Sequence, residues 1–162
     1  MSNDQYARTG RTMFILAWLI FFIFLFLFFH YYGQENEPRY RIQQGQLILD
    51  ADEQGHYRMP GHINDRPVHF LLDTGASLVA VPQTLANQLH LTGRYPVRIQ
   101  TAGGNITGML TRLDKLEFGK FTLKNVKAVI IPGDRDKMVL MGMNVLNQFN
   151  MIQKNKQLII KH

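Results

Sequence analysis

The chain has 162 residues, a formal net charge of +6 and no cysteine, and 46% of its residues are hydrophobic. Without cysteine it has no disulfide bonds, which neither supports nor excludes an oxidising compartment. Its lysines and arginines form no cluster interleaved with aromatic residues, so nucleic-acid binding has no support, and we interpret the positive charge as a solubilising surface.

A long apolar segment lies near the N-terminus. Residues 13–29 are all apolar, and no Asp, Glu, Lys or Arg occurs between residues 12 and 34. One helix that crosses a bilayer needs about 20 residues, so we predict a transmembrane anchor over residues 13–32. The alternative is a cleaved signal peptide, but the segment ends in bulky aromatic residues where a cleavage site would need small ones.

The residues that flank this segment bear on its orientation. Two arginines precede it, and two glutamates follow it before the next arginine. The positive-inside rule therefore favours a cytoplasmic N-terminus. We predict a short cytoplasmic tail at residues 1–12, a linker at 33–45 that carries Pro38, and one domain at 46–162 that lies outside the cytoplasm.

The predicted domain consists mostly of short strands. The segments that favour strands are 46–50, 56–63, 67–72, 97–102, 105–112, 116–118, 124–131 and 157–161. Pro82 opens one short helix, and a second is predicted over residues 143–149. The pattern indicates an all-β domain with one or two short helices. Its last strand is apolar enough to associate with another chain if it forms an open edge.

An apolar strand leads directly into a carboxylate, because residues 68–72 precede Asp73, Thr74 and Gly75. An aspartic protease presents its catalytic acid in this way: one carboxylate of a pair acts as general base on water, and its protonated neighbour polarises the scissile carbonyl. Gly75 allows backbone N–H groups to approach the Asp73 oxygens, and the Thr74 hydroxyl is expected to bond across a two-fold axis. The alternative is a simple turn, since Asp and Gly are common turn residues.

Two further glycine positions support this interpretation. Gly103 and Gly104 lie between the alternating segments 97–100 and 106–110, which is typical of a hairpin turn. A glycine-rich tip suits a lid that opens for substrate, although an ordinary surface hairpin has the same pattern. Gly142 ends an apolar strand, where close packing against the Asp73 loop would exclude a side chain.

In this order, these segments resemble the retropepsin-like aspartic proteases, and most closely their bacterial single-pass membrane members. The resemblance runs from about residue 45 to the C-terminus and implies a retropepsin-like half-barrel whose terminal strands interleave between subunits. It implies three groups of site residues: catalytic Asp73, Thr74 and Gly75; substrate-binding Ala76, Ala102, Gly103, Gly104 and Asn105; and a second signature at Leu140, Met141 and Gly142.

We therefore expect an aspartic endopeptidase anchored in the bacterial inner membrane, with its domain in the periplasm. The chain has one Asp-Thr-Gly element and an aspartic protease needs two, so the expected partners are a second copy, a peptide or protein substrate, and the bilayer around residues 13–32. No cofactor or metal is expected, since His56, His62 and His69 lack a metal-ligand spacing. The alternative is a non-catalytic retropepsin-fold module that binds peptides or acts as a scaffold.

Overall fold

The computed structural model describes the backbone of residues 3–32, 40–101, 103–133 and 138–162, with the side chains of residues 13–28 in the first segment and all those of the other three. The chain divides into two compact units, Met1–Glu37 and Pro38–His162. Each unit is described separately below.

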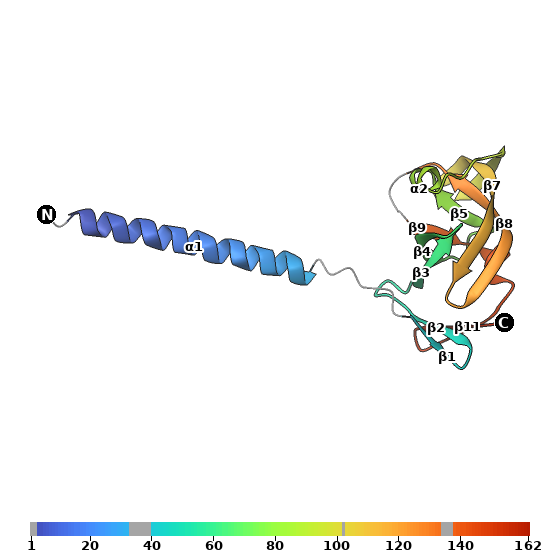
Figure 1. The fold of residues 1–162 in the computed structure, drawn as a ribbon, viewed down its shortest axis with the longest axis horizontal. Coiled ribbons are helices and arrows are strands. Elements are labelled where there is room, and N and C mark those ends of the chain that lie inside the picture. The colour runs from blue at the N-terminus through green and yellow to red at the C-terminus, as the bar shows by residue number, and fades with distance from the viewer. Residues whose placement is uncertain (1–2, 33–39, 102, 134–137) are drawn as a thin grey trace. The chain divides into compact units, whose positions relative to one another are not determined.

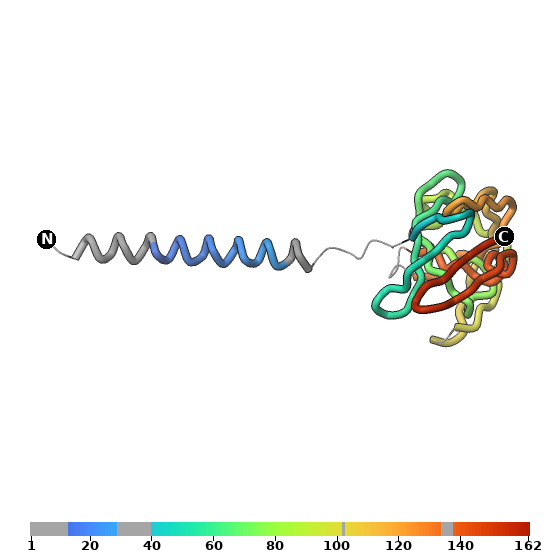
Figure 2. Tube along the Cα trace, turned by 90° about the horizontal axis from the view of Figure 1, so that it is seen from below, coloured from blue at the N-terminus to red at the C-terminus, as the bar shows by residue number. Residues whose placement is uncertain are grey.

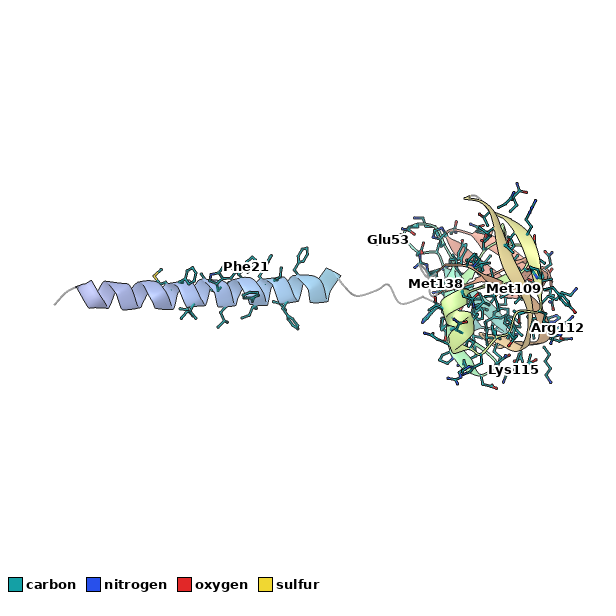
Figure 3. All side chains as sticks on the ribbon, turned by 90° about the horizontal axis from the view of Figure 1, so that it is seen from above. Phe21, Glu53, Met109, Arg112, Lys115 and Met138 are labelled. Carbon is teal, nitrogen blue, oxygen red and sulfur yellow. The ribbon has the colours of Figure 1, made fainter. Side chains whose placement is uncertain are left out.

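The first unit contains one helix, α1 (Asn3–Tyr32). The side chains of residues 13–28 are exposed, apart from the half-buried Leu25, and they project from every side of the helix (Figure 3). Across the described residues, no helix meets the length and apolarity that a membrane crossing requires. The anchor at residues 13–32 stays a prediction.

The second unit contains a four-stranded antiparallel sheet, which we call the terminal sheet. Its strands, in spatial order, are β1 (Tyr40–Gln43), β2 (Gln46–Asp50), β11 (Gln157–Lys161) and β10 (Asn150–Lys154). Figure 2 shows the hairpin β1–β2 (cyan) beside the hairpin β10–β11 (red). One face of the sheet packs on the core through Leu47, Leu49, Leu158 and Ile160.

The terminal sheet corrects two sequence predictions. Residues 40–43, assigned to the linker, pair with β2, so the folded domain begins before residue 46. The last strand, considered as a contact to another chain if it formed an open edge, lies between β2 and β10 and is paired on both sides. Its bounds, and those of β2, are as predicted.

The second sheet has seven strands, most of which are labelled in Figure 1, and Asp73 directly follows one of them. Its strands, in spatial order, are β3 (Arg58–Ile63), β4 (Arg66–Leu72), β9 (Met138–Met141), β5 (Val79–Pro82), β8 (Phe121–Ile131), β7 (Gly104–Phe118) and β6 (Tyr95–Thr101). Because β3 also pairs with β7, the sheet curls back on itself. The predicted strands 105–112 and 116–118 form one strand, β7, since its pairing with β8 extends across both segments.

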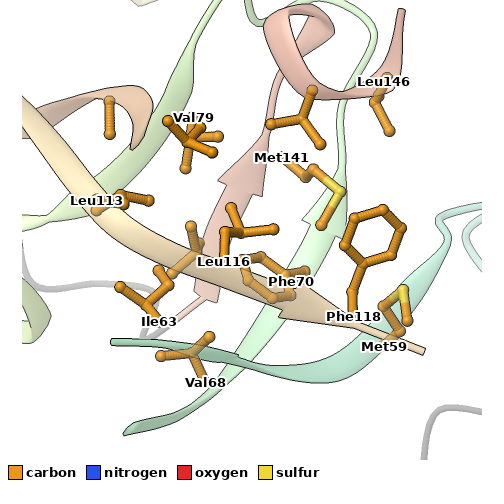
Figure 4. Packing of buried hydrophobic residues seen from close by; sticks show 14 of the residues in the cluster. Met59, Ile63, Val68, Phe70, Val79, Leu113, Leu116, Phe118, Met141 and Leu146 are labelled. Carbon is orange, nitrogen blue, oxygen red and sulfur yellow. The ribbon is translucent and has the colours of Figure 1, made fainter. Parts of the chain in front are cut away.

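Apolar side chains from both sheets form one core. Phe70 of β4, Leu116 of β7 and Met141 of β9 are fully buried within it (Figure 4). The helices α2 (Gln83–Gln88) and α3 (Met143–Leu146) are short. The second helix ends before the predicted residue 149, because Phe149 already belongs to a hydrogen-bonded turn that leads into β10. The domain is therefore mostly β with few helices, as predicted.

The loop between β2 and β3 is organised by the carboxylate of Asp52. Its Oδ1 accepts hydrogen bonds from the backbone N–H of Gln54 (2.9 Å) and of His56 (2.8 Å). The Nε of Arg58 lies 3.0 Å from Oδ2 as an ion pair, although no acceptor among the described residues is aligned with that N–H. Partial burial would raise the pKa of Asp52, but the two hydrogen bonds and Arg58 outweigh it and lower the pKa below 3.8.

This lowered pKa predicts a pH-dependent stability. A carboxylate whose pKa is lower in the folded state stabilises the fold above its unfolded pKa and loses that contribution as the pH falls through the folded value. We expect Asp52→Asn to reduce the free energy of unfolding near neutral pH, with a deficit relative to wild type that begins to shrink near pH 3.8 and is lost as the pH falls through the lower pKa of the folded state. Denaturant unfolding across this range measures it. A deficit that persists unchanged in acid would contradict the electrostatic explanation, and Asp114→Asn at an exposed position is the control.

Candidate active site

Asp73 immediately follows β4, beside the parallel strand β9. Its backbone N–H donates to the carbonyl of Met141 (3.1 Å), and its Oδ1 accepts a hydrogen bond from the N–H of Gly75 (2.8 Å). The N–H of Ala76 donates to the carbonyl of Asp73 (3.3 Å) and closes the turn. Asp73 is half-buried while Thr74 and Gly75 are exposed. The backbone thus holds one carboxylate oxygen, as the sequence predicted for Gly75.

An apolar strip lies next to this carboxylate. Leu140 of β9 pairs with Leu71 of β4 on one side and with Ala80 of β5 on the other. Leu71 and Leu140 are half-buried, whereas their neighbours Phe70 and Val139 are fully buried on the opposite face. Strand alternation puts Leu71 on the same side as Asp73. The strip offers apolar contacts to groups beside the carboxylate. Sequence reasoning did not identify Leu71 and Ala80 as site residues. For Leu71 a signal was available: side chains alternate along a strand, so with Phe70 facing the core Leu71 faces the other side.

Gly142 packs against the backbone of the Asp73 loop. A Cβ at this position would lie 2.4 Å from the carbonyl oxygen of Leu78 and 2.8 Å from that of Ala76. These distances are far below van der Waals contact, so no side chain fits. The predicted close approach of Gly142 to the Asp73 loop is confirmed in its geometry.

Hydrogen bonds join the two segments directly. The N–H of Met143 donates to the carbonyl of Ala76 (2.8 Å), and the N–H of Asn144 donates to that of Ser77 (3.1 Å). The side chain of Asn144 also accepts from the N–H of Val79 (3.0 Å) and donates to the carbonyl of Lys127 (2.8 Å). Asn144 therefore fastens α3 to β5 and β8. Sequence reasoning did not identify it; its polarity within an apolar helical segment was the available signal.

The predicted flap is a hairpin of β6 and β7. Thr101 pairs with Gly104, and the Thr101 hydroxyl donates to the carbonyl of Gly104 (2.7 Å). Gly104 has a φ of +111°, which favours glycine. Gly103, Gly104 and Asn105 are exposed, and Ala102 lies outside the described residues. The hairpin is confirmed, but within the described residues its tip makes no hydrogen bond to the Asp73 loop. Its role as a substrate lid stays a prediction.

The base of this hairpin is seated on β8 through Gly108. A Cβ at Gly108 would lie 2.6 Å from Cδ1 of Ile99, and 2.8 Å from both the Ile130 carbonyl oxygen and Cγ2 of Val129. Atoms of Ile99 on β6 and of Val129 and Ile130 on β8 therefore occupy the space that a side chain at Gly108 would need.

We expect Gly108→Ala to displace Ile99 and loosen the hairpin. Overpacking of this kind costs about 1–3 kcal/mol in the free energy of unfolding. Amide hydrogen exchange in β6 should accelerate more than exchange in β5. The control is Gly103→Ala, whose Cβ would meet its nearest atom, Thr101 Oγ1, at 3.8 Å. Unchanged exchange in β6 of Gly108→Ala would show that Gly108 does not seat the hairpin.

Part of the chain that contains this site matches the model of a known protein family. The family model described as "gag-polyprotein putative aspartyl protease" matches residues 59–148, a range that contains both Asp73 and Gly142. Among the described residues, no group of three or more His, Asp or Glu side chains is placed to hold a metal ion.

Two curated relatives and one solved structure are similar to the chain. An uncharacterized Sinorhizobium protein from the cobV 5′ region is 25% identical over 113 residues, which cover 68% of this chain and 48% of the relative. An uncharacterized protein of Rickettsia prowazekii (strain Madrid E) is 27% identical over 128 residues, 76% of this chain and 54% of the relative. The chain thus spans about half the length of these relatives. The crystal structure of a retropepsin-like aspartic protease from Rickettsia conorii matches with a TM-score of 0.63 and 27% identity, covering 75% of this chain and 94% of that one.

Proposed function

Because the chain belongs to the gag-polyprotein aspartyl protease family and has a retropepsin-like fold, we propose that it is an aspartic endopeptidase that works as a homodimer. The observation that carries this proposal is the Asp73 loop: a half-buried carboxylate, held by the Gly75 N–H, at the end of a strand beside an apolar strip. One chain supplies one such loop, and a second copy supplies the other.

The chemistry follows from two carboxylates placed close together. Two such groups cannot both ionise at low cost, so the pair shares a proton. The ionised member removes a proton from water, which attacks the scissile carbonyl, and the protonated member polarises that carbonyl. The Gly75 N–H already engages Oδ1 of Asp73, which leaves Oδ2 for the second carboxylate and the water. The exposed Thr74 is available to contact the partner subunit.

The substrate is proposed to be an extended peptide. The flap tip at Gly103 and Gly104 would pair with its backbone, as in strand addition, and the half-buried Leu71 and Leu140 would contact its side chains. Apolar side chains beside the scissile bond are therefore the expected preference.

Residues 13–32 are proposed to anchor the protein in the bacterial inner membrane, with a cytoplasmic N-terminus and the domain in the periplasm. The support is the uncharged apolar run within α1. In a bacterium the full-length chain should sediment with membranes, and protease added to spheroplasts should digest the domain. A chain found in the soluble fraction, or a domain digested only after lysis, would contradict this proposal.

The shared active site is tested by dilution and by mixing subunits. Cleavage of a randomised peptide library by the full-length chain in detergent should lose about tenfold in rate per subunit for each tenfold dilution below the dimer dissociation constant. Excess Asp73→Asn subunits should inhibit wild-type chains, because mixed dimers lack one carboxylate. If the rate per subunit is independent of dilution and of added Asp73→Asn chains, the site is not shared between subunits. If no cleavage occurs at any concentration, a peptide-binding module becomes the better interpretation.

A further inference from the structure

The side chain of Arg58 lies on the same side of the sheet as that of Asp73. Arg58 of β3 pairs with Leu71 of β4, and directly opposite residues of an antiparallel pair project to the same face. The next pair along these strands, Met59 and Phe70, is fully buried on the other face. Since strand alternation puts Leu71 on the side of Asp73, Arg58 lies on that side too.

Arg58 is also near Asp73. The N–H of Leu72 donates to the carbonyl of Tyr57 (3.0 Å), so the two strands stay together up to the residue before Asp73. Asp73 follows Leu71 by two residues, which makes it a diagonal neighbour of Arg58. Diagonal neighbours lie about 7–8 Å apart, within reach of long side chains. An extended peptide advances about 3.3 Å per residue, so a peptide bound at Asp73 has a guanidinium within about three residues of its scissile bond.

The carboxylate of Asp52 holds the guanidinium of Arg58 at one edge. The Nε of Arg58 is buried and lies 3.0 Å from Oδ2 of Asp52, while 39% of the Arg58 side chain is exposed. Asp52 is itself fixed, because its Oδ1 accepts hydrogen bonds from the N–H groups of Gln54 and His56. A guanidinium has five N–H donors in a planar fork. The contact at Nε therefore leaves the two terminal nitrogens for a second anion.

The single negative charge of Asp52 is shared among several partners. Nδ1 of His56 lies 3.8 Å from Oδ2 of Asp52, so a protonated His56 adds a second cation beside Arg58. Glu53, the other acidic residue of this loop, is exposed, and within the described residues Asp52 is the only acidic side chain in ion-pair contact with Arg58. Asp52 therefore compensates the positive charge of Arg58 only in part, which favours a further carboxylate from outside the chain.

The apolar strip beside Asp73 ends at Arg58. Ala80 of β5 pairs with Leu140 of β9, and Leu140 pairs with Leu71 of β4. Leu71 then pairs with Arg58 of β3, so a row across four strands passes from apolar side chains to a guanidinium. Arginine suits carboxylates because its planar fork matches their two oxygens. A peptide lying along this row meets apolar contacts first and a cation last.

We propose that Arg58 is a specificity-determining residue of this site, and that its terminal nitrogens bind the carboxylate of an aspartate or glutamate that lies within about three residues of the scissile bond. The substrate class is then an extended peptide that combines apolar side chains, held by the strip, with one acidic side chain. This inference rests on the proposed function, because it concerns the substrate of the same site.

Matched peptides test the contact without any variant. Cleavage of a randomised peptide library by the full-length chain in detergent should enrich Asp or Glu at one position near the scissile bond. A peptide with Glu at that position should have a kcat/KM at least about tenfold above that of its Gln counterpart, as expected for a charge-assisted hydrogen bond. The difference should lie mainly in KM, because the contact is remote from the reacting atoms. Equal kcat/KM for the two peptides would overturn the proposal.

A pair of variants assigns this preference to Arg58. Arg58→Gln should bring the ratio of kcat/KM between the Glu and Gln peptides to about one, whereas a purely structural role would lower both values equally and keep the ratio. Arg41→Gln is the matched control: Nη1 of Arg41 lies 3.6 Å from Oδ2 of Asp50 in the terminal sheet, and its side chain is 46% exposed. This control should keep the wild-type ratio. A ratio that survives in Arg58→Gln, or falls equally in Arg41→Gln, would contradict the assignment.

Peptide binding to Asp73→Asn separates this inference from the proposed function. Fluorescence anisotropy is measured with a panel of labelled apolar peptides, each carrying one Glu at a different position, and with their Gln counterparts. One Glu peptide should bind at least about fivefold more tightly than its counterpart, and adding Arg58→Gln should remove the difference. Selective binding without cleavage by wild type would refute the protease and leave Arg58 as a binding residue. Cleavage by wild type without discrimination would refute this inference alone, and so would equal binding of every pair.

Discussion

Asp73→Asn is expected to reduce peptide cleavage by about a thousandfold or more, because each dimer loses both of its carboxylates and proton transfer by such groups contributes about 10²–10⁴-fold. The amide of asparagine keeps an oxygen that can accept the 2.8 Å hydrogen bond from the Gly75 N–H. The loop should therefore keep its shape while losing the group that takes a proton from water.

The measurement combines cleavage of a peptide library with thermal unfolding and the dimer dissociation constant. Only cleavage should change. Asp114→Asn makes the same chemical change at an exposed position on β7 and should cleave at the wild-type rate. If purified Asp73→Asn retains cleavage within about tenfold of wild type, well short of the contribution expected from the carboxylate pair, then Asp73 is not the catalytic acid.

The part of the site that could be predicted from sequence is the part set by local chemistry. An apolar run followed by Asp-Thr-Gly specifies a strand that ends in a tight turn, and the structure shows that turn with Gly75 bonded to Asp73. A glycine at the end of an apolar strand signals a close approach, and Gly142 makes one. In both cases the residues adjacent in sequence are enough to predict the local backbone structure.

The pairing of distant segments could not be predicted in this way. β9 inserts between β4 and β5, so that Leu140 meets both Leu71 and Ala80. The sequence of residues 138–141 does not by itself predict that this strand pairs with β4 and β5. The apolar strip beside Asp73 therefore appears only once the strand order is known.

Two edge strands, β1 and β10, were missed by sequence reasoning, as was the central strand β5. All four residues of β1 are exposed, so no alternation of buried and exposed positions marks it, and Pro38 nearby favoured a linker. β10 has one half-buried residue, Met151, among four exposed ones. They are recognised as strands only because β1 pairs with β2 and β10 pairs with β11. The pairing of β2 with β11 then joins the two ends of the domain.

Gly142→Ala is expected to lower both stability and activity. The added Cβ would lie 2.4 Å from the Leu78 carbonyl oxygen, 2.6 Å from its carbon and 2.8 Å from the Ala76 oxygen. All three are backbone atoms, so no side-chain rotation relieves the overlap. We expect a loss of about 3 kcal/mol in the free energy of unfolding, the upper end of the usual cost of overpacking. Denaturant unfolding of the full-length chain measures it, with Gly103→Ala as the control for replacing an uncrowded glycine.

The same displacement should reach Asp73, the proposed catalytic acid. To accept the Cβ, the segment Ala76–Leu78 must move away from Gly142, and the 2.8 Å hydrogen bond from the Met143 N–H to Ala76 must lengthen. The turn that positions Asp73 moves with it. A misplacement of about 1 Å can cost about a hundredfold in rate, so kcat should fall by about that factor in the dimer that still forms. Since the three atoms nearest to the added Cβ belong to Leu78 and Ala76 and none belongs to the β6–β7 hairpin, KM should change less than kcat. A variant that is destabilised but keeps its kcat would show that Gly142 supports the fold without positioning Asp73.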